Sequence, residues 1–98
     1  MESVPAIDRL QAMEPGLRAA GLTALYLFGS AARGRAEPAS DIDLLFESDR
    51  GAGFSLIDQA RLQHELSDAL GAPVDLIERA ALRPSVRKIV EAEMQRIF

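Results

Sequence analysis

Two aspartates separated by one residue, Asp41 and Asp43, have the clearest chemical potential in this sequence. They are followed by an apolar run that reads as a strand, and side chains alternate between the two faces of a strand. Asp41 and Asp43 are therefore expected on one face, as a paired carboxylate ligand. Carboxylate oxygens suit Mg²⁺, which proteins usually bind through one or two carboxylates together with substrate phosphates. The pair predicts a magnesium site for a phosphorylated substrate.

A third acid, Asp75, interrupts the apolar run 74–77. This run is short enough to be a strand, and a carboxylate at a core position is costly unless it is paired or binds a metal. Asp75 is therefore a candidate for the same site. The alternative is that Asp75 is an ordinary residue of an edge strand.

A glycine–serine turn precedes the aspartates by about ten residues. The apolar run 25–28 is typical of a buried strand, and Gly29 and Ser30 end it. Glycine allows close approach of a ligand, and free N–H groups at the start of the helix expected next can bind phosphate. A tight turn that needs small residues is the alternative interpretation. Arg33 could neutralise a triphosphate or form a surface salt bridge, and Ser40 could contact the nucleotide or cap the loop.

The remaining elements follow from periodicity and breakers. Strands are expected at about 24–28, 41–46 and 74–77. A first helix should end near Met13, and a short turn should follow to residue 20. A longer helix should begin at Ser55, with Asp58 completing a capping signal, and end at Gly71. Its expected buried residues are Ala60, Leu66, Ala69 and Leu70, with Leu56 or Ile57. Pro84 should open a last helix with the apolar face Val86, Ile89, Val90, Met94 and Ile97.

Composition narrows the class of protein. Ninety-eight residues with 48% hydrophobic residues predict one globular domain, with little room for a second substrate-binding domain. The sequence has no cysteine, no apolar run long enough for a membrane span and no signal-peptide pattern, which favours the cytoplasm. The net charge of −4 argues against direct nucleic-acid binding and suits a basic protein partner. A small basic cluster, Arg83, Arg87 and Lys88, is interpreted as a solvated helix face, with nucleotide or partner contact as the alternative.

The residues 25–47 resemble the signature of the polymerase β-like nucleotidyltransferases. The closest similarity is to their minimal nucleotidyltransferases (MNT), the antitoxins of HEPN–MNT toxin–antitoxin pairs. The matching residues are Phe28, Gly29, Ser30, Ala32, Arg33 and Gly34, followed by Ser40, Asp41, Ile42, Asp43 and Leu44. The resemblance implies an α+β fold with a small mixed β-sheet and helices packed on one face, formed by a single domain over residues 1–98.

The resemblance also implies an activity. Asp41, Asp43 and Asp75 would be the catalytic and metal-binding residues of a two-ion Mg²⁺ site. Gly29, Ser30, Arg33 and Ser40 would bind the nucleotide. The chain would transfer AMP from ATP to a tyrosine hydroxyl of a cognate HEPN ribonuclease toxin and form a hetero-oligomer with it.

Two alternatives remain open at this point. A non-catalytic antitoxin would neutralise the toxin by binding alone, and intact aspartates at all three positions argue against it. A small-molecule nucleotidyltransferase of the aminoglycoside type normally needs a longer chain. The base of the nucleotide, the acceptor residue and the oligomeric state are left open by the sequence.

Overall fold

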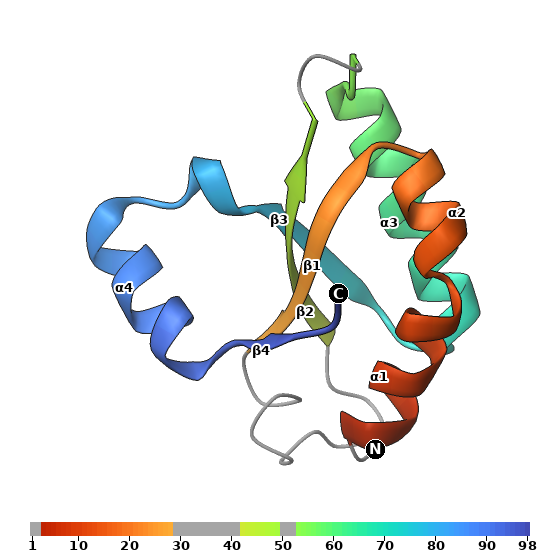
Figure 1. The fold of residues 1–98 in the computed structure, drawn as a ribbon, viewed down its shortest axis with the longest axis horizontal. Helices are drawn as coiled ribbons and strands as arrows, with labels where there is room; N and C mark the ends of the chain where they lie inside the picture. Colours follow the sequence, from red (N-terminus) through yellow and green to blue (C-terminus); the bar gives the residue numbers. More distant parts are fainter. Residues whose placement is uncertain (1–2, 29–41, 50–52) are drawn as a thin grey trace.

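Four strands form one mixed sheet with helices on both sides (Figure 1). The computed structural model describes residues 3–28, 42–49 and 53–98. The strand order is β3-β2-β1-β4, with β1 antiparallel to both of its neighbours and β2 parallel to β3. The elements are α1 (Ser3–Ala12), α2 (Glu14–Ala19), β1 (Leu22–Phe28), β2 (Ile42–Ser48), α3 (Leu56–Leu70), β3 (Val74–Glu78), η2 (Arg79–Ala81), α4 (Pro84–Glu93) and β4 (Gln95–Arg96).

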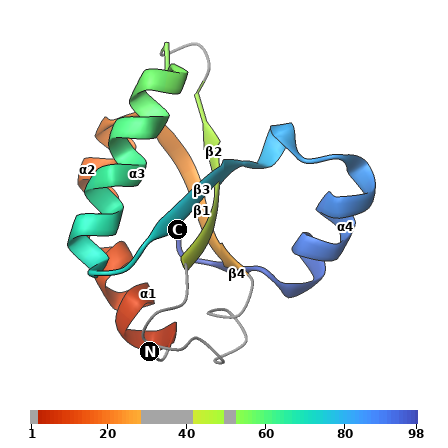
Figure 2. The same cartoon turned by 180° about the vertical axis from the view of Figure 1, so that it is seen from behind.

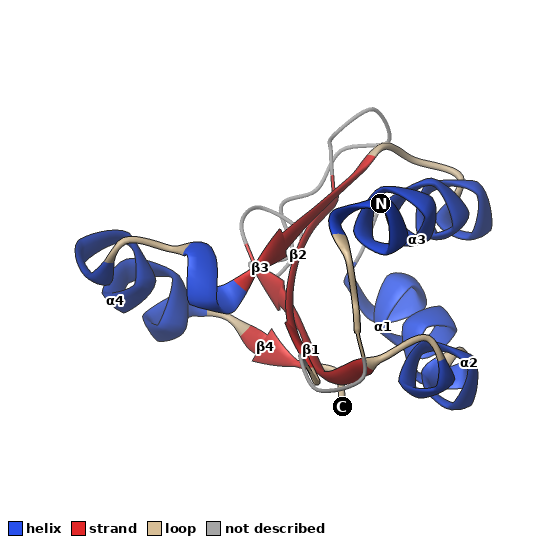
Figure 3. Ribbon diagram, turned by 90° about the horizontal axis from the view of Figure 1, so that it is seen from above, coloured by secondary structure: helices blue, strands red, loops and turns tan. Residues whose placement is uncertain are grey.

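The main core lies between the sheet and α1, α2 and α3, which all cover one face of it (Figure 3). Alternate strand residues point into this core, since the side-chain period of a strand is two. The sheet contributes buried residues such as Leu25, Leu27, Leu44, Phe46 and Leu76. The residues between them therefore lie on the opposite face of the sheet. The predicted fold class, a small mixed sheet with helices packed against it, is confirmed.

The opposite face carries a smaller cluster and one helix. Ala24, Tyr26 and Leu45 are buried there, and Val90 and Met94 from the α4 region pack against them. In both Figure 1 and Figure 2, α4 lies across the sheet from α1, α2 and α3. The prediction placed all helices on one face of the sheet. It is correct for α1, α2 and α3, but α4 lies on the opposite face. Tyr26 and Leu45 present apolar surface on this second face, and packing of the α4 region buries that surface.

The helix α3 begins and ends as its capping residues predict. Ser55 and Asp58 form a reciprocal capping box, and Gly71 ends the helix in the left-handed conformation with φ of 67°. The buried side of the helix differs from the prediction. Leu62, Leu66 and Leu70 are buried, whereas Leu56, Ile57, Ala60 and Ala69 are exposed. The four-residue spacing of three leucines gives one stripe along the helix, and that stripe faces the core.

The last helix is shorter than predicted. The helix α4 ends at Glu93, and the chain then forms β4 against β1, with Tyr26 opposite Arg96 and Leu27 opposite Gln95. Ile97 is buried through this strand pairing, not through a helical face, and Val86 and Ile89 are exposed. The backbone N–H of Ile97 donates to Leu25 O at 2.8 Å, so sheet pairing supplies the hydrogen bonds that a longer helix would have made.

Replacing Leu66 by alanine should lower the free energy of unfolding by about 2–5 kcal/mol, because the side chain is fully buried and the change leaves a cavity. Leu56→Ala in the same helix is the matched control. Leu56 is 82% exposed, and its substitution should cost no more than about 0.5 kcal/mol. Urea denaturation of the two variants measures the difference, and equal losses would contradict the assigned face of α3.

Candidate functional site

Asp43 and Asp75 lie side by side on the sheet. They are direct partners in the parallel register of β2 and β3, so their backbones lie about 4.7–4.9 Å apart. Both fall between residues of the main core, on the face of the sheet that α4 shares. On its other side Asp43 is the register partner of Phe28, the last residue of β1. The fold therefore brings together two acids that are far apart in the sequence, at the point where β1 ends.

Asp75 lies in a more open position than its apolar neighbours suggest. Its side chain is exposed, whereas Val74 and Leu76 on either side of it are buried. The strand β3 is an edge strand of the sheet. The interpretation of Asp75 as a carboxylate at a core position is therefore wrong. The alternation of the strand explains the error, because it places apolar Val74 and Leu76 on one face and Asp75 on the other.

Five predicted site residues lie outside the described part of the chain. Gly29 directly follows β1 in the sequence and Asp41 directly precedes β2, so both adjoin elements that the structure places next to Asp43. Ser30, Arg33 and Ser40 belong to the same stretch. Their predicted contacts with a nucleotide remain predictions.

The donor set around Asp43 fits a divalent cation of the magnesium type. Two carboxylates on adjacent strands offer oxygen ligands to one side of the sheet, and Mg²⁺ binds through such carboxylates and substrate phosphates. Within the described ranges, no three side chains of the histidine, cysteine, aspartate and glutamate types form a metal-binding group. The third predicted carboxylate, Asp41, lies outside those ranges.

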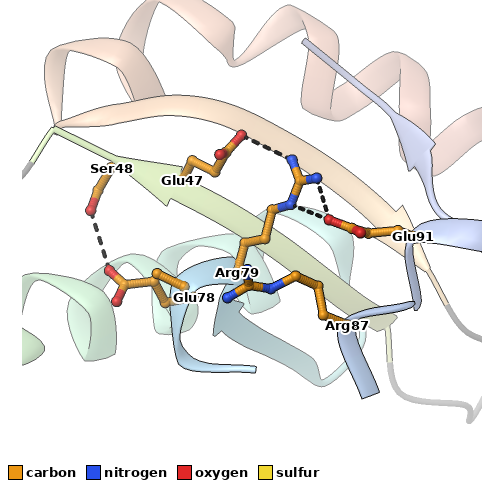
Figure 4. A pocket seen from close by; sticks show the side chains of 7 residues that line it. Glu47, Ser48, Glu78, Arg79, Arg87 and Glu91 are labelled. Carbon is orange, nitrogen blue, oxygen red and sulfur yellow. Dashed lines mark hydrogen bonds and ion pairs between the residues drawn. The ribbon is translucent and has the colours of Figure 1, made fainter. Parts of the chain in front are cut away.

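A polar network occupies the opposite ends of the same strands (Figure 4). Arg79, which directly follows β3, forms an ion pair with Glu47 of β2 at 3.5 Å and donates from Nη1 to the hydroxyl of Tyr26 at 3.2 Å. Its Nε donates to Glu91 of α4 at 2.9 Å, and its Nη2 also pairs with that carboxylate. Arg79 thus connects β1, β2 and α4. These bonds to Glu91 are the main reason that the pKa of Arg79 is raised, so its charge persists across the working pH range.

Sequence reasoning missed this network, although part of it was visible in the strand pattern. Glu47 lies an even number of residues after Asp43, and so shares its face of β2. An acid so placed on an otherwise apolar strand predicts a partner across the sheet. The identity of that partner depends on the β2–β3 register, which the sequence does not specify.

The pKa of Tyr26 should lie above its ordinary value of 10.0. Burial is the main cause, and the carboxylate of Glu47, which accepts the hydroxyl hydrogen at 2.7 Å, adds to it. Because the folded pKa is the higher one, the stabilisation by this group is present below about pH 10 and is lost as pH rises through the folded pKa. Tyr26 is the single tyrosine, so tyrosinate absorbance reports it alone. Glu47→Gln should lower this pKa.

Glu65→Gln, a change of an exposed residue on α3, is the control for that titration. It should leave the curve of Tyr26 where it is in the wild type. If Glu47→Gln also leaves it there, the hydrogen bond between Tyr26 and Glu47 does not form in solution.

Comparisons with known proteins identify the family to which the chain belongs. The family model described as "Nucleotidyltransferase domain" matches residues 9–97, and the chain belongs to this family. A proposed protein adenylyltransferase of Methanocaldococcus jannaschii is 39% identical over 67 residues, covering 68% of this chain and 70% of that protein. Nucleotidyltransferases of this family generally use a nucleoside triphosphate and a divalent metal ion.

Solved structures show a more specific similarity within this family. A protein described as a minimal nucleotidyltransferase matches with a TM-score of 0.84 and 34% identity, over 97% of this chain and 95% of that one. A chain from a toxin–antitoxin complex with AMP-PNP matches with a TM-score of 0.74 and 25% identity, over 92% of this chain and 72% of that one. The resemblance to the minimal nucleotidyltransferases that the sequence motif indicated is confirmed. No helix in the described part of the chain has the length and apolar character needed to cross a membrane.

Proposed function

We propose that this chain is a protein adenylyltransferase antitoxin, which transfers AMP from ATP to a tyrosine hydroxyl of a HEPN-domain toxin in the cytoplasm. The observation that carries the proposal is the register pairing of Asp43 with Asp75 beside the end of β1. In the sequence, the glycine–serine turn directly follows β1 and Asp41 directly precedes β2. The relative from M. jannaschii, named for protein adenylylation, supports a protein acceptor.

The reaction would be a displacement at the α-phosphate. The acceptor hydroxyl oxygen forms a bond to the α-phosphorus, the bond from this phosphorus to the bridging oxygen of pyrophosphate breaks, and pyrophosphate leaves. Asp75, exposed at the edge of the sheet, would receive the proton of the hydroxyl. Gly29 and Ser30 would bind the outer phosphates, and Arg33 and Ser40 would add contacts to the nucleotide.

Asp41, Asp43 and Asp75 would hold two Mg²⁺ ions. Bound Mg²⁺ would neutralise charge on the triphosphate and stabilise the attacking and leaving oxygens. The role of the protein in such a reaction is mainly to position the groups and to balance charge, which two adjacent carboxylates on rigid strands do well.

The toxin–antitoxin complex among the solved structures supports a toxin as the partner, and that complex contains an ATP analogue. The test combines the chain, ATP, Mg²⁺ and a HEPN-domain protein encoded beside it, and weighs that protein by intact mass spectrometry. A gain of one or more AMP units is expected. If the toxin gains no mass while its ribonuclease activity is suppressed, the chain acts by binding alone and the proposed catalytic function is wrong.

A further inference from the structure

Three polar side chains of α3 lie along the outer edge of β3, the edge that β2 does not cover. Gln59, Gln63 and Ser67 follow one another at intervals of four residues, so they form one stripe of the helix. The stripe runs beside the buried leucines Leu62 and Leu66, which hold this side of the helix against the sheet. The outer edge of β3 is therefore within reach of side chains from α3.

The three side chains make hydrogen bonds to the backbone of β3. The backbone N–H of Val74 donates to the hydroxyl oxygen of Ser67 at 3.1 Å. The N–H of Leu76 donates to Oε1 of Gln63 at 3.0 Å, and its carbonyl oxygen accepts from Nε2 of Gln59 at 2.9 Å. An edge strand normally leaves such groups to solvent or to another strand. In this fold α3 occupies them.

The residues bonded to α3 stand directly before and after Asp75. Along a strand, the backbone groups of successive residues point to opposite edges. Those of Val74 and Leu76 point to α3, so those of Asp75 point to β2. There Asp75 is the register partner of Asp43. The strand is thus held from both of its edges at the position of the exposed carboxylate.

We propose that Gln59, Gln63 and Ser67 are positioning residues for Asp75. The inference rests on the proposed function. Without these bonds β2 alone would pair with the backbone of β3, and an edge strand paired on one side opens more readily. A shift of about 1 Å in a reacting group can lower a rate about a hundredfold. The stripe acts through the backbone of β3, because α3 covers the face of the sheet opposite to the side chain of Asp75.

The two glutamines offer different groups to the same residue, which gives a matched pair of variants. Gln63 accepts a hydrogen bond from Leu76 and Gln59 donates one to it. An ionised carboxylate can only accept. Gln63→Glu should therefore keep the bond and the rate of AMP transfer. Gln59→Glu places a carboxylate against a carbonyl oxygen, and it should lower the rate about tenfold or more.

A second pair of variants separates the reaction from nucleotide binding. Gln63→Met keeps the length of the side chain and removes the acceptor. Transfer to the toxin, followed by intact mass spectrometry, should fall about tenfold or more. Titration calorimetry should show an affinity for ATP with Mg²⁺ close to that of the wild type, because Asp43 lies on β2 and keeps its place. His64→Met, at an exposed position of the same helix, should change neither property.

Amide hydrogen exchange tests the bonds without any reaction. The N–H of Leu76 should exchange several-fold faster in Gln63→Met than in the wild type, because it loses its acceptor. The N–H of Asp75, which points to β2, should change less. Thermal melting of each variant ensures that the fold is kept. If Gln63→Met melts below the assay temperature, the comparison of Gln63→Glu with Gln59→Glu decides the question.

The outcomes separate this inference from the proposed function. Unchanged exchange of Leu76 in Gln63→Met would show that the bond does not form, and a normal rate of transfer would show that the reaction does not need it. Either result refutes the positioning role while the catalytic function stands. Equal rates for Gln63→Glu and Gln59→Glu refute it as well, since added charge on α3 would then act alike at both sites. A wild type that transfers no AMP refutes the proposed function, and the positioning role with it.

Discussion

Replacing Asp75 by asparagine should lower nucleotidyl transfer by a factor of about 10²–10⁴, the usual contribution of a positioned acid or base. The amide is nearly isosteric with the carboxylate, but it neither receives the proton nor offers the charge that a metal ion requires. Because Asp75 is exposed on an edge strand, the free energy of unfolding should change by no more than about 0.5 kcal/mol. Intact mass spectrometry of the toxin measures the transfer, and urea denaturation measures the stability.

Asp8→Asn is the matched control for that experiment. Asp8 is exposed on α1, across the sheet from the site, so the variant should transfer AMP at the rate of the wild type. An Asp75→Asn variant that modifies the toxin as fast as the wild type would remove Asp75 from the mechanism. Equal suppression of the toxin by both proteins without any mass gain would favour neutralisation by binding.

Replacing Asp43 by asparagine should abolish most binding of ATP in the presence of Mg²⁺. Asp43 lies centrally, between Phe28 of β1 and Asp75 of β3, where the triphosphate is proposed to lie. Loss of its charge would remove a proposed ligand of the metal ion, which would join the protein to the phosphates. Titration calorimetry should show a weakening of at least about tenfold for both ATP and inorganic triphosphate.

Equal losses for the two ligands would place the effect of Asp43→Asn at the phosphates, because inorganic triphosphate has no base. A folded Asp43→Asn protein that retains full affinity for ATP with Mg²⁺ would exclude Asp43 as a metal ligand. Thermal melting of the variant ensures that a loss of binding is not a loss of fold.

Local sequence signals predicted the strands around the site well. The short apolar runs that end in a turn correspond to β1, β2 and β3, because their residue types and alternation are local properties. The pairing of Asp43 with Asp75 needed more than this. It depends on the parallel register of two strands joined through α3, and the motif resemblance, not the periodicity, indicated that both acids belong to one site.

Features that depend on contacts between residues far apart in the sequence were not predicted. The strand β4 has only two residues, and it forms because Tyr26 and Leu27 offer a free edge of β1, which nothing in the adjacent sequence encodes. The buried face of α3 was ambiguous because apolar residues occur on several sides of that helix, and packing against the sheet selected the leucine stripe. The hydrogen bonds of Arg79 likewise depend on residues of other elements, namely Tyr26, Glu47 and Glu91.

The crossover from β2 through α3 to β3 has a consequence for the order in which the chain acquires function. A partly folded molecule that has paired only β1 with β2 contains Asp43 but lacks its neighbour, since Asp75 arrives only when β3 docks at the edge. Such a molecule would lack part of the proposed nucleotide site. ATP would thus bind only molecules in which β3 has docked, and by mass action it would protect the edge strand from local opening. In hydrogen exchange, amides of β3 would report occupancy of the site by slowing when ATP is added.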